Sequence, residues 1–135
     1  MSEIDPMDQG QEAQPWPIDR VGVVGMGLIG GSIALDLSQQ GVEVQGLVHR
    51  EVTAERARSR GLAPLVSTDP SCLQNCDLVI LALPLESLLS PQESLIKALP
   101  ERAVVTDVGS VKAEVLAVWR DLHPRFVGSH PMAGT

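Results

Sequence analysis

Three glycines at a fixed spacing are the first residues in this sequence that indicate chemistry. Gly25, Gly27 and Gly30 follow the apolar run 21–24 and precede a stretch with helical periodicity. In that context the first glycine permits a tight turn, the second leaves room for a pyrophosphate, and the third lets the helix pack closely on a sheet. Unpaired amides at the helix start favour phosphate groups. The pattern predicts a dinucleotide site, and the alternative is a turn whose glycines serve packing alone.

The end of the next apolar run bears on which dinucleotide is bound. NAD sites usually carry an acid about 20 residues after the glycines. The residues at that distance are Val48, His49 and Arg50, and none is acidic. A guanidinium there suits a 2′-phosphate, to which His49 would add a donor. We therefore expect NADP rather than NAD, although Glu51 would bring an acid to the ribose after a slip of one residue, and Arg50 would otherwise be a solvated residue at a helix start.

Two later segments carry further polar groups. Residues 106–112 contain Asp107, Ser110 and Lys112, and residues 127–135 contain His130. Both segments follow predicted strands, and open α/β sheets bind ligands beyond the carboxyl ends of their strands. Ser110 also suits the N-cap of a helix that starts at Val111, and the two roles are compatible.

The elements that must position these groups alternate between strand and helix. Short connections between alternating elements predict parallel strands joined by crossover helices, and hence an α/β fold with a doubly wound, mostly parallel sheet of the Rossmann type. Asp69-Pro70 predicts a helix start, and Ser90-Pro91-Gln92-Glu93 predicts a capping box. The expected strands are 21–24, 42–48, 78–83, 103–106 and 125–128, and the expected helices are 28–40, 53–60, one from 69, 90–99 and 111–122.

Composition and charge separate a tail from a body. The chain has 135 residues and a net charge of −7, and its first 19 residues contain five acids and no base. The rest, with twelve acids and ten bases, lacks the basic surface that nucleic-acid binding requires. We expect a disordered acidic tail over 1–18 and one dinucleotide-binding domain over 19–135. Without a membrane span or an export signal, we expect a cytoplasmic protein that binds neither membrane nor nucleic acid.

Three residues of types that often bind metals receive plainer interpretations. Cys72 and Cys76 have no other Cys or His close in sequence, which favours two buried or free thiols over a disulfide or a zinc site. His123, beside Pro124 and outside the motifs, is expected on the surface. We predict no metal site.

The glycine turn, the 106–112 segment and the run Ser129-His130-Pro131-Met132-Ala133-Gly134 together resemble the prephenate and arogenate dehydrogenase family of tyrosine biosynthesis. The resemblance covers about residues 20–135 and departs from the family at Ser129, where glycine is usual. It implies an oxidative decarboxylation in which His130 removes the proton of the substrate hydroxyl and Ser110 lies near the histidine and the nicotinamide; the expectation that the cofactor is NADP comes from Arg50. An imidazole suits this task at neutral pH. The residues expected to contact the cofactor are Gly25, Gly27, Leu28, Ile29, Gly30, His49, Arg50, Leu83, Pro84 and Ser110.

The resemblance also implies a C-terminal helical domain that forms a homodimer and binds the substrate carboxylates. The sequence ends at Thr135, in a loop-like run, so we expect the cofactor half of such an enzyme, inactive when isolated. NADP preference tilts the substrate toward arogenate rather than prephenate. Two alternatives stay open, namely a non-catalytic dinucleotide-binding module or inert fragment, and another Rossmann dehydrogenase such as a 3-hydroxyacid dehydrogenase.

Overall fold

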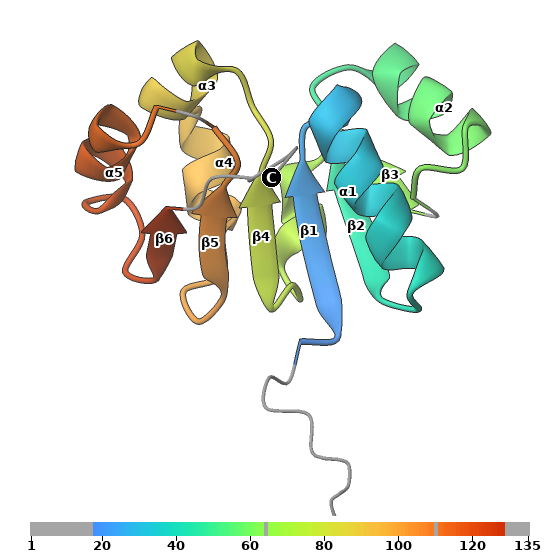
Figure 1. Ribbon diagram of the computed structural model, residues 1–135, viewed down its shortest axis with the longest axis horizontal. Helices are drawn as coiled ribbons and strands as arrows, with labels where there is room; N and C mark the ends of the chain where they lie inside the picture. Colours follow the sequence, from blue (N-terminus) through green and yellow to red (C-terminus); the bar gives the residue numbers. More distant parts are fainter. Residues whose placement is uncertain (1–17, 64, 110, 129–135) are drawn as a thin grey trace, which may run out of the picture.

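The computed structural model describes residues 18–63, 65–109 and 111–128. In these residues six strands form one sheet in the order β3-β2-β1-β4-β5-β6, and every neighbouring pair is parallel (Figure 1). This is the doubly wound arrangement that the alternating pattern predicts. The strands are β1 (Arg20–Val24), β2 (Glu43–Leu47), β3 (Leu65–Ser67), β4 (Leu78–Leu81), β5 (Val104–Asp107) and β6 (Phe126–Gly128).

The helices of the described residues connect these strands. Helix α1 ends in a Schellman motif, in which Gly41 takes a left-handed φ of 87° and Val42 N–H donates to Leu37 O. No helix of this part of the chain has the length and apolar character needed to cross a membrane. The helices are α1 (Leu28–Gln39), α2 (Glu51–Ser59), the 3₁₀ helix η1 (Pro70–Leu73), α3 (Leu85–Leu89), α4 (Glu93–Ala98) and α5 (Ala113–Trp119).

The two faces of the sheet have separate apolar cores. On one face, strand residues such as Val23 and Val44 pack with Ala34 of α1 and Ala54 of α2. Ile18 is partly buried against this cluster. On the other face, helices η1, α3, α4 and α5 contribute buried side chains to the second core. Figure 1 shows α1 in front of the sheet and α4 behind it. Strands β1, β2 and β4 contribute residues to both cores, so the middle of the sheet is buried on both faces.

All six strands end on one row of paired residues. Val24 pairs with Leu47 and with Leu81, Leu81 pairs with Asp107, and Asp107 pairs with Gly128. Leu47 also pairs with Ser67, the last residue of β3. The loops that follow the strands therefore all begin at the same edge of the sheet.

Several local predictions are wrong at element ends. The 90–99 segment has no capping box, because Ser90 closes α3 and Gln92 is the N-cap of α4. Helix α5 begins at Ala113 rather than Val111, so the Ser110 N-cap prediction is wrong as well. Strand β3 and helix α3 were not predicted, and β4 ends at Leu81 rather than Leu83.

The prediction that Asp69 caps a helix is confirmed, and the prediction that His123 lies on the surface is wrong. Asp69 accepts a hydrogen bond from the amide of Ser71 at 3.0 Å, which lowers the pKa of its carboxyl group. His123 is only 5% exposed. Its Nδ1 accepts a hydrogen bond from Arg125 N, so its Nε2 donates to Pro100 O at 2.8 Å. This histidine links the turn after α5 to the turn before β5.

Candidate functional site

The turn between β1 and α1 requires its first glycine for two reasons. Gly25 has a φ of 96°, a left-handed conformation that side chains with a Cβ rarely adopt. A Cβ there would also overlap the carbonyl oxygen of Ala82, directly after β4. The amide of Gly25 donates to Leu47 O at 2.8 Å. The turn therefore closes tightly over the junction of β1, β2 and β4.

The other two glycines differ sharply in what surrounds them. A Cβ at Gly30 would overlap the carbonyl oxygen of Gly25 and lie 3.0 Å from Cβ of Ala82, so Gly30 allows the helix to approach its own turn as well as the sheet. A Cβ at Gly27 would meet no protein atom within 4 Å. Gly27 is the N-cap of α1, where amides lack intrahelical partners. Open space beside those amides fits a pyrophosphate.

Leu28 and Ile29 form the first turn of α1 and extend their side chains to solvent. Leu28 is 89% exposed and Ile29 is 51% exposed. A shallow groove of about 480 Å³ runs from Gly27 and Leu28 toward Arg56 and Arg60. Because the side chains of Leu28 and Ile29 are exposed, the backbone amides of these two residues are the groups that could contact phosphates.

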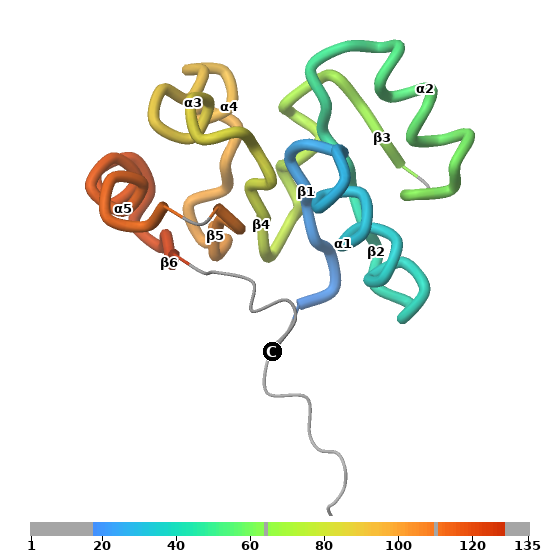
Figure 2. Tube along the Cα trace, turned by 45° about the horizontal axis from the view of Figure 1, so that its top comes forward, coloured from blue at the N-terminus to red at the C-terminus, as the bar shows by residue number. Residues whose placement is uncertain are grey.

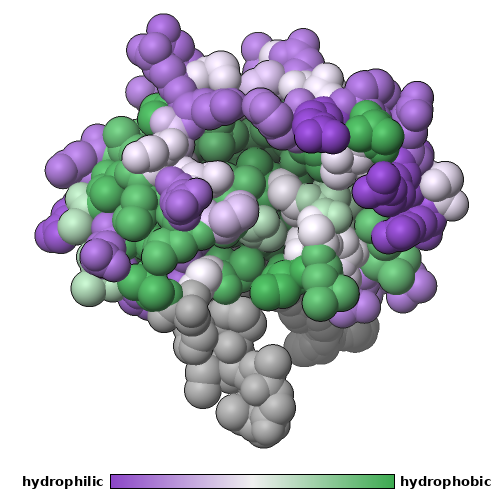
Figure 3. Space-filling model, turned by 90° about the horizontal axis from the view of Figure 1, so that it is seen from above, coloured by the Kyte–Doolittle hydropathy of each residue, from purple (hydrophilic) through white to green (hydrophobic). Residues whose placement is uncertain are grey.

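A larger cleft of about 570 Å³ opens at the carboxyl ends of the strands. Figure 2 shows the ends of β1 and β4 between α2 on one side and α3 on the other. Seen onto this end, apolar residues line the middle, and the rim on the α2 side is mainly hydrophilic (Figure 3). The cleft brings together four of the residues predicted to contact cofactor: Gly25, His49, Leu83 and Pro84.

Sequence reasoning missed other residues of this cleft. Thr68 follows β3, and Glu86 and Gln92 come from the α3–α4 region. Thr53 of α2 also lines the cleft. The only sequence signal for Thr68 is its position just before the Asp69-Pro70 helix start. The others depend on how α2, α3 and α4 pack around the strand ends, which no local pattern encodes.

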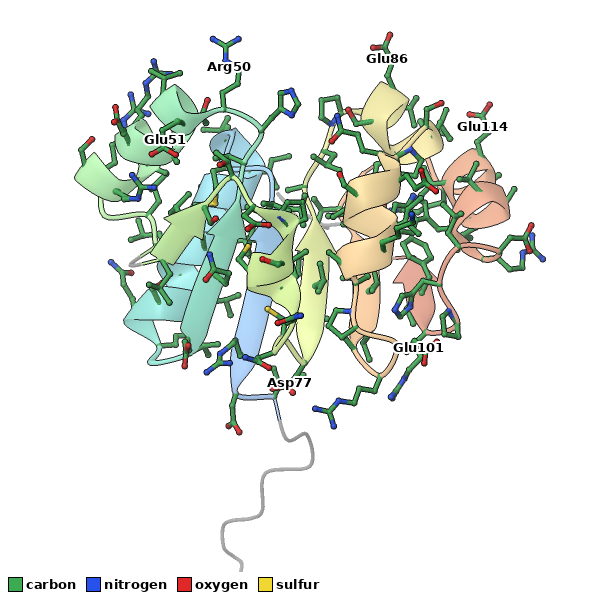
Figure 4. All side chains as sticks on the ribbon, turned by 180° about the vertical axis from the view of Figure 1, so that it is seen from behind. Arg50, Glu51, Asp77, Glu86, Glu101 and Glu114 are labelled. Carbon is green, nitrogen blue, oxygen red and sulfur yellow. The ribbon has the colours of Figure 1, made fainter. Side chains whose placement is uncertain are left out.

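Arg50 is the N-cap of α2 and directly follows the cleft residue His49, but it is not among the residues that line the cleft, and its side chain is exposed. Val48, which lies at the distance where NAD sites place an acid, is apolar and 6% exposed. Arg50 and Glu51 leave the start of α2 in different directions, Arg50 away from the sheet and Glu51 against the helix (Figure 4). The carboxylate of Glu51 accepts a hydrogen bond from Arg58 Nη1 at 3.2 Å.

The loop after β5 is organised by a buried carboxylate. Asp107 is fully buried, and its Oδ2 accepts hydrogen bonds from Gly109 N at 3.0 Å and from Lys112 Nζ at 2.6 Å. These two donors lie on either side of position 110 in sequence. Ser110, like His130, falls outside the described residues. Asp107 is paired with Gly128, so the segments leading to Ser110 and His130 leave the sheet from adjacent strand ends.

The two cysteines are free thiols. Burial raises the pKa of Cys72 and of Cys76 to about 11 each, and the neighbouring charges of Asp69 and Cys72, respectively, add to this effect. At neutral pH both remain protonated and unreactive. Among the described residues, no group of three His, Cys, Asp or Glu side chains is placed to hold a metal ion.

Residues 33–135 match the family model described as "Prephenate dehydrogenase, nucleotide-binding domain". The prephenate dehydrogenase of Lactococcus lactis is 32% identical over 119 residues, which are 84% of this chain and 34% of the relative. The prephenate dehydrogenase of Bacillus subtilis is 33% identical over 124 residues, 87% of this chain and 33% of the relative. The chain thus spans about a third of the length of these relatives.

Solved structures of several dehydrogenases are also similar to this chain. Arogenate dehydrogenase of Synechocystis is 38% identical, with a TM-score of 0.72 over 86% of this chain and 42% of the other. Prephenate dehydrogenase of A. aeolicus, in complex with hydroxyphenyl propionate and NAD⁺, is 30% identical with a TM-score of 0.78 over 90% and 44%. A (S)-3-hydroxybutyryl-CoA dehydrogenase from Ralstonia eutropha, at 19% identity and a TM-score of 0.71, shares the fold.

Proposed function

We propose, since this chain belongs to the prephenate dehydrogenase family through its nucleotide-binding domain, that it is the cofactor-binding part of an enzyme that oxidatively decarboxylates arogenate or prephenate with NADP⁺. The observation that carries the proposal is the common row at which all six strands end. The glycine turn and the segments that lead to Arg50, Ser110 and His130 all begin at this row, on one edge of the sheet. Ligands of doubly wound sheets bind at that edge.

The residues around the glycine turn suit the binding of a dinucleotide. The open space at Gly27 would take the pyrophosphate, and the exposed Arg50, next to the cleft residue His49, would take the 2′-phosphate. The buried, apolar Val48 offers nothing to a 2′-hydroxyl, which supports NADP rather than NAD. When bound, the nicotinamide accepts the hydride from the ring carbon that carries the hydroxyl.

The catalytic part of the proposal concerns Ser110 and His130. We assign to His130 the removal of the substrate hydroxyl proton, which imidazole can perform near neutral pH. We assign to Ser110 the orientation of that imidazole. The pairing of Asp107 with Gly128 supports this, because it starts both segments from neighbouring strands.

The substrate is proposed to be arogenate in preference to prephenate. The proposed use of NADP and the 38% identity to the Synechocystis arogenate dehydrogenase support this choice. The groups that bind the substrate carboxylates would come from the part of the relatives that this chain does not span, and so would the contacts of a homodimer. A cytoplasmic location belongs to the same proposal.

The test is an assay of the full-length protein with arogenate and prephenate, each with NADP⁺ and NAD⁺, together with cofactor titrations of wild type and Arg50→Ala. Arg50→Ala should weaken NADP binding by about 1.5–3 kcal/mol, as for a hydrogen bond to a charged group, and change NAD binding little. Equal losses for the two cofactors would contradict the role of Arg50. A full-length protein that binds NADP and turns over neither substrate would instead favour a non-catalytic module.

A further inference from the structure

One ion pair on α2 is anchored more firmly than an ordinary surface pair. Arg58 and Glu51 are seven residues apart, which places them two helical turns apart on one face. Arg58 Nη1 lies 3.2 Å from Glu51 Oε2, and Arg58 Nη2 donates to the carbonyl oxygen of Val66 at 2.9 Å. Val66 belongs to the edge strand β3 and is buried. The guanidinium, whose side chain is 42% exposed, therefore bridges the helix and the sheet.

The position of Glu51 gives this pair its importance. Glu51 directly follows Arg50, and an acid in this region is the group that accepts hydrogen bonds from the ribose hydroxyls of NAD. The Glu51 side chain is 59% exposed, so only its partner limits where the carboxylate goes. A carboxylate turned toward the rim would repel a 2′-phosphate and attract a 2′-hydroxyl.

We propose that Arg58 determines cofactor specificity by holding the Glu51 carboxylate away from the adenine ribose, so that the 2′-phosphate of NADP meets Arg50 alone. This inference rests on the proposed NADP-binding function. Arg58 is a positioning residue: it contacts Glu51 and does not contact the cofactor itself. The hydrogen bond from Arg58 to Val66 O orients the guanidinium in advance, so Arg58 loses little further conformational freedom when it binds the Glu51 carboxylate.

The opposite directions of Arg50 and Glu51 support this assignment (Figure 4). Adjacent residues at a helix start do not face each other, so the two charges can serve separate partners. Arg50 directly precedes Glu51 in sequence, so a carboxylate released from Arg58 would add negative charge close to the group proposed to bind the phosphate.

The experiment compares the dissociation constants of NADP and NAD for wild type, R58Q, E51Q and the R58Q/E51Q double variant. In R58Q we expect NADP affinity to fall about tenfold, because the released Glu51 carboxylate repels the 2′-phosphate. We expect NAD affinity to rise about threefold, because the same carboxylate attracts the 2′-hydroxyl. E51Q alone should change NADP affinity less than about twofold, because Glu51 is already held away. The double variant should return to within about twofold of wild type.

The matched control is R20Q, which breaks another Arg–Glu pair at the opposite end of the sheet, where Arg20 Nε lies 2.8 Å from Glu43 Oε2. It should leave both affinities unchanged. A loss in R58Q that is equal for the two cofactors, or that E51Q does not restore, would overturn the inference and indicate a purely structural role for Arg58. A wild-type chain that binds NADP no better than NAD would overturn the proposed cofactor, and this inference with it.

Discussion

Lys112 Nζ lies 2.6 Å from Oδ2 of Asp107, a carboxylate with no exposed surface at the end of β5. The Lys112 side chain keeps 25% of its surface exposed, so the pair joins a buried group to a half-buried one. The same Oδ2 also binds the amide of Gly109. This carboxylate therefore binds a backbone amide on one side of position 110 and a lysine side chain on the other.

Lys112→Met should destabilise the protein strongly. Removal of one partner leaves a buried charge without its counter-ion, which typically costs about 3–5 kcal/mol, and the remaining amide bond and partial exposure favour the lower end. Urea unfolding would measure the change. Lys97→Met is the control, because Lys97 and Glu93 form an exposed pair at 3.5 Å and its loss should cost less than about 0.5 kcal/mol. Equal losses for the two variants would show that Asp107 does not depend on Lys112.

Gly27→Val and Gly30→Ala should separate binding from folding. A side chain at Gly27 enters open space, so the fold should survive with a loss of about 1 kcal/mol at the N-cap while cofactor binding disappears. A methyl group at Gly30 overlaps the Gly25 carbonyl and should cost about 3 kcal/mol. Thermal unfolding and cofactor titration report the two effects. A Gly27→Val protein with wild-type affinity would remove the glycine turn from the site.

Asp77 should contribute stability that depends on pH. Its Oδ2 accepts hydrogen bonds from Asp19 N at 2.9 Å and Arg20 N at 3.1 Å, which lowers the pKa of the carboxyl group in the folded state. The contribution is therefore complete above the unfolded pKa, near 4, and is lost as the pH falls through the lower folded value. Asp77→Asn should cost about 1 kcal/mol at neutral pH and progressively less in acid.

Unfolding of Asp77→Asn at a series of pH values would check this prediction, with the exposed Asp121→Asn as its control. A stability difference between wild type and Asp77→Asn that stays constant from neutral pH to acid would contradict it. The two bonds tie the start of β1 to the start of β4, so the effect should be a general loss of stability with no change in cofactor affinity.

His130→Asn should lower the turnover of the full-length protein. General-base catalysis typically contributes about 10²- to 10⁴-fold, so kcat should fall within that range while cofactor affinity stays nearly constant. The wild-type rate should rise with pH through an ionisation typical of histidine, and this rise should vanish in the variant. Ser110→Ala should cost less, because we expect it to orient the imidazole without carrying the proton. A near-normal kcat with an unchanged pH profile would exclude His130 as the base.

The sequence predicted best those features that local chemistry determines. The three glycines, the Asp69 cap and the glycine-terminated helix α1 depend on backbone conformation and short-range contacts, and the structure has all of them. The alternation of apolar and helical segments was sufficient to predict the parallel sheet. Each of these signals requires a particular residue type at a particular place, which makes it readable without knowledge of tertiary packing.

Features that depend on packing escaped prediction. The three residues of β3 are too few for a periodic signal, and β3 exists because Val66 is buried beside β2. Helix α5 begins two residues later than expected, directly after Lys112, which binds Asp107, and no helix propensity reflects this contact. The burial of His123 could not be predicted because its acceptor, Pro100 O, lies 23 residues earlier in the chain. The cleft residues Thr68 and Gln92 likewise meet only in the folded chain.

The residues proposed to select the cofactor and those proposed to transfer the proton follow different strands along the common row of strand ends. Four strand spacings separate the end of β2, which leads to Arg50, from the end of β6, which leads to His130, a distance of about 19 Å. That distance exceeds the screening length of about 8 Å in physiological salt, so a change of charge near one strand end has little electrostatic effect near the other. Substitutions around α2 that change the proposed cofactor preference would therefore leave the electrostatic environment of the proposed proton-transfer groups largely unchanged. In such a design, selection can act on the two properties independently.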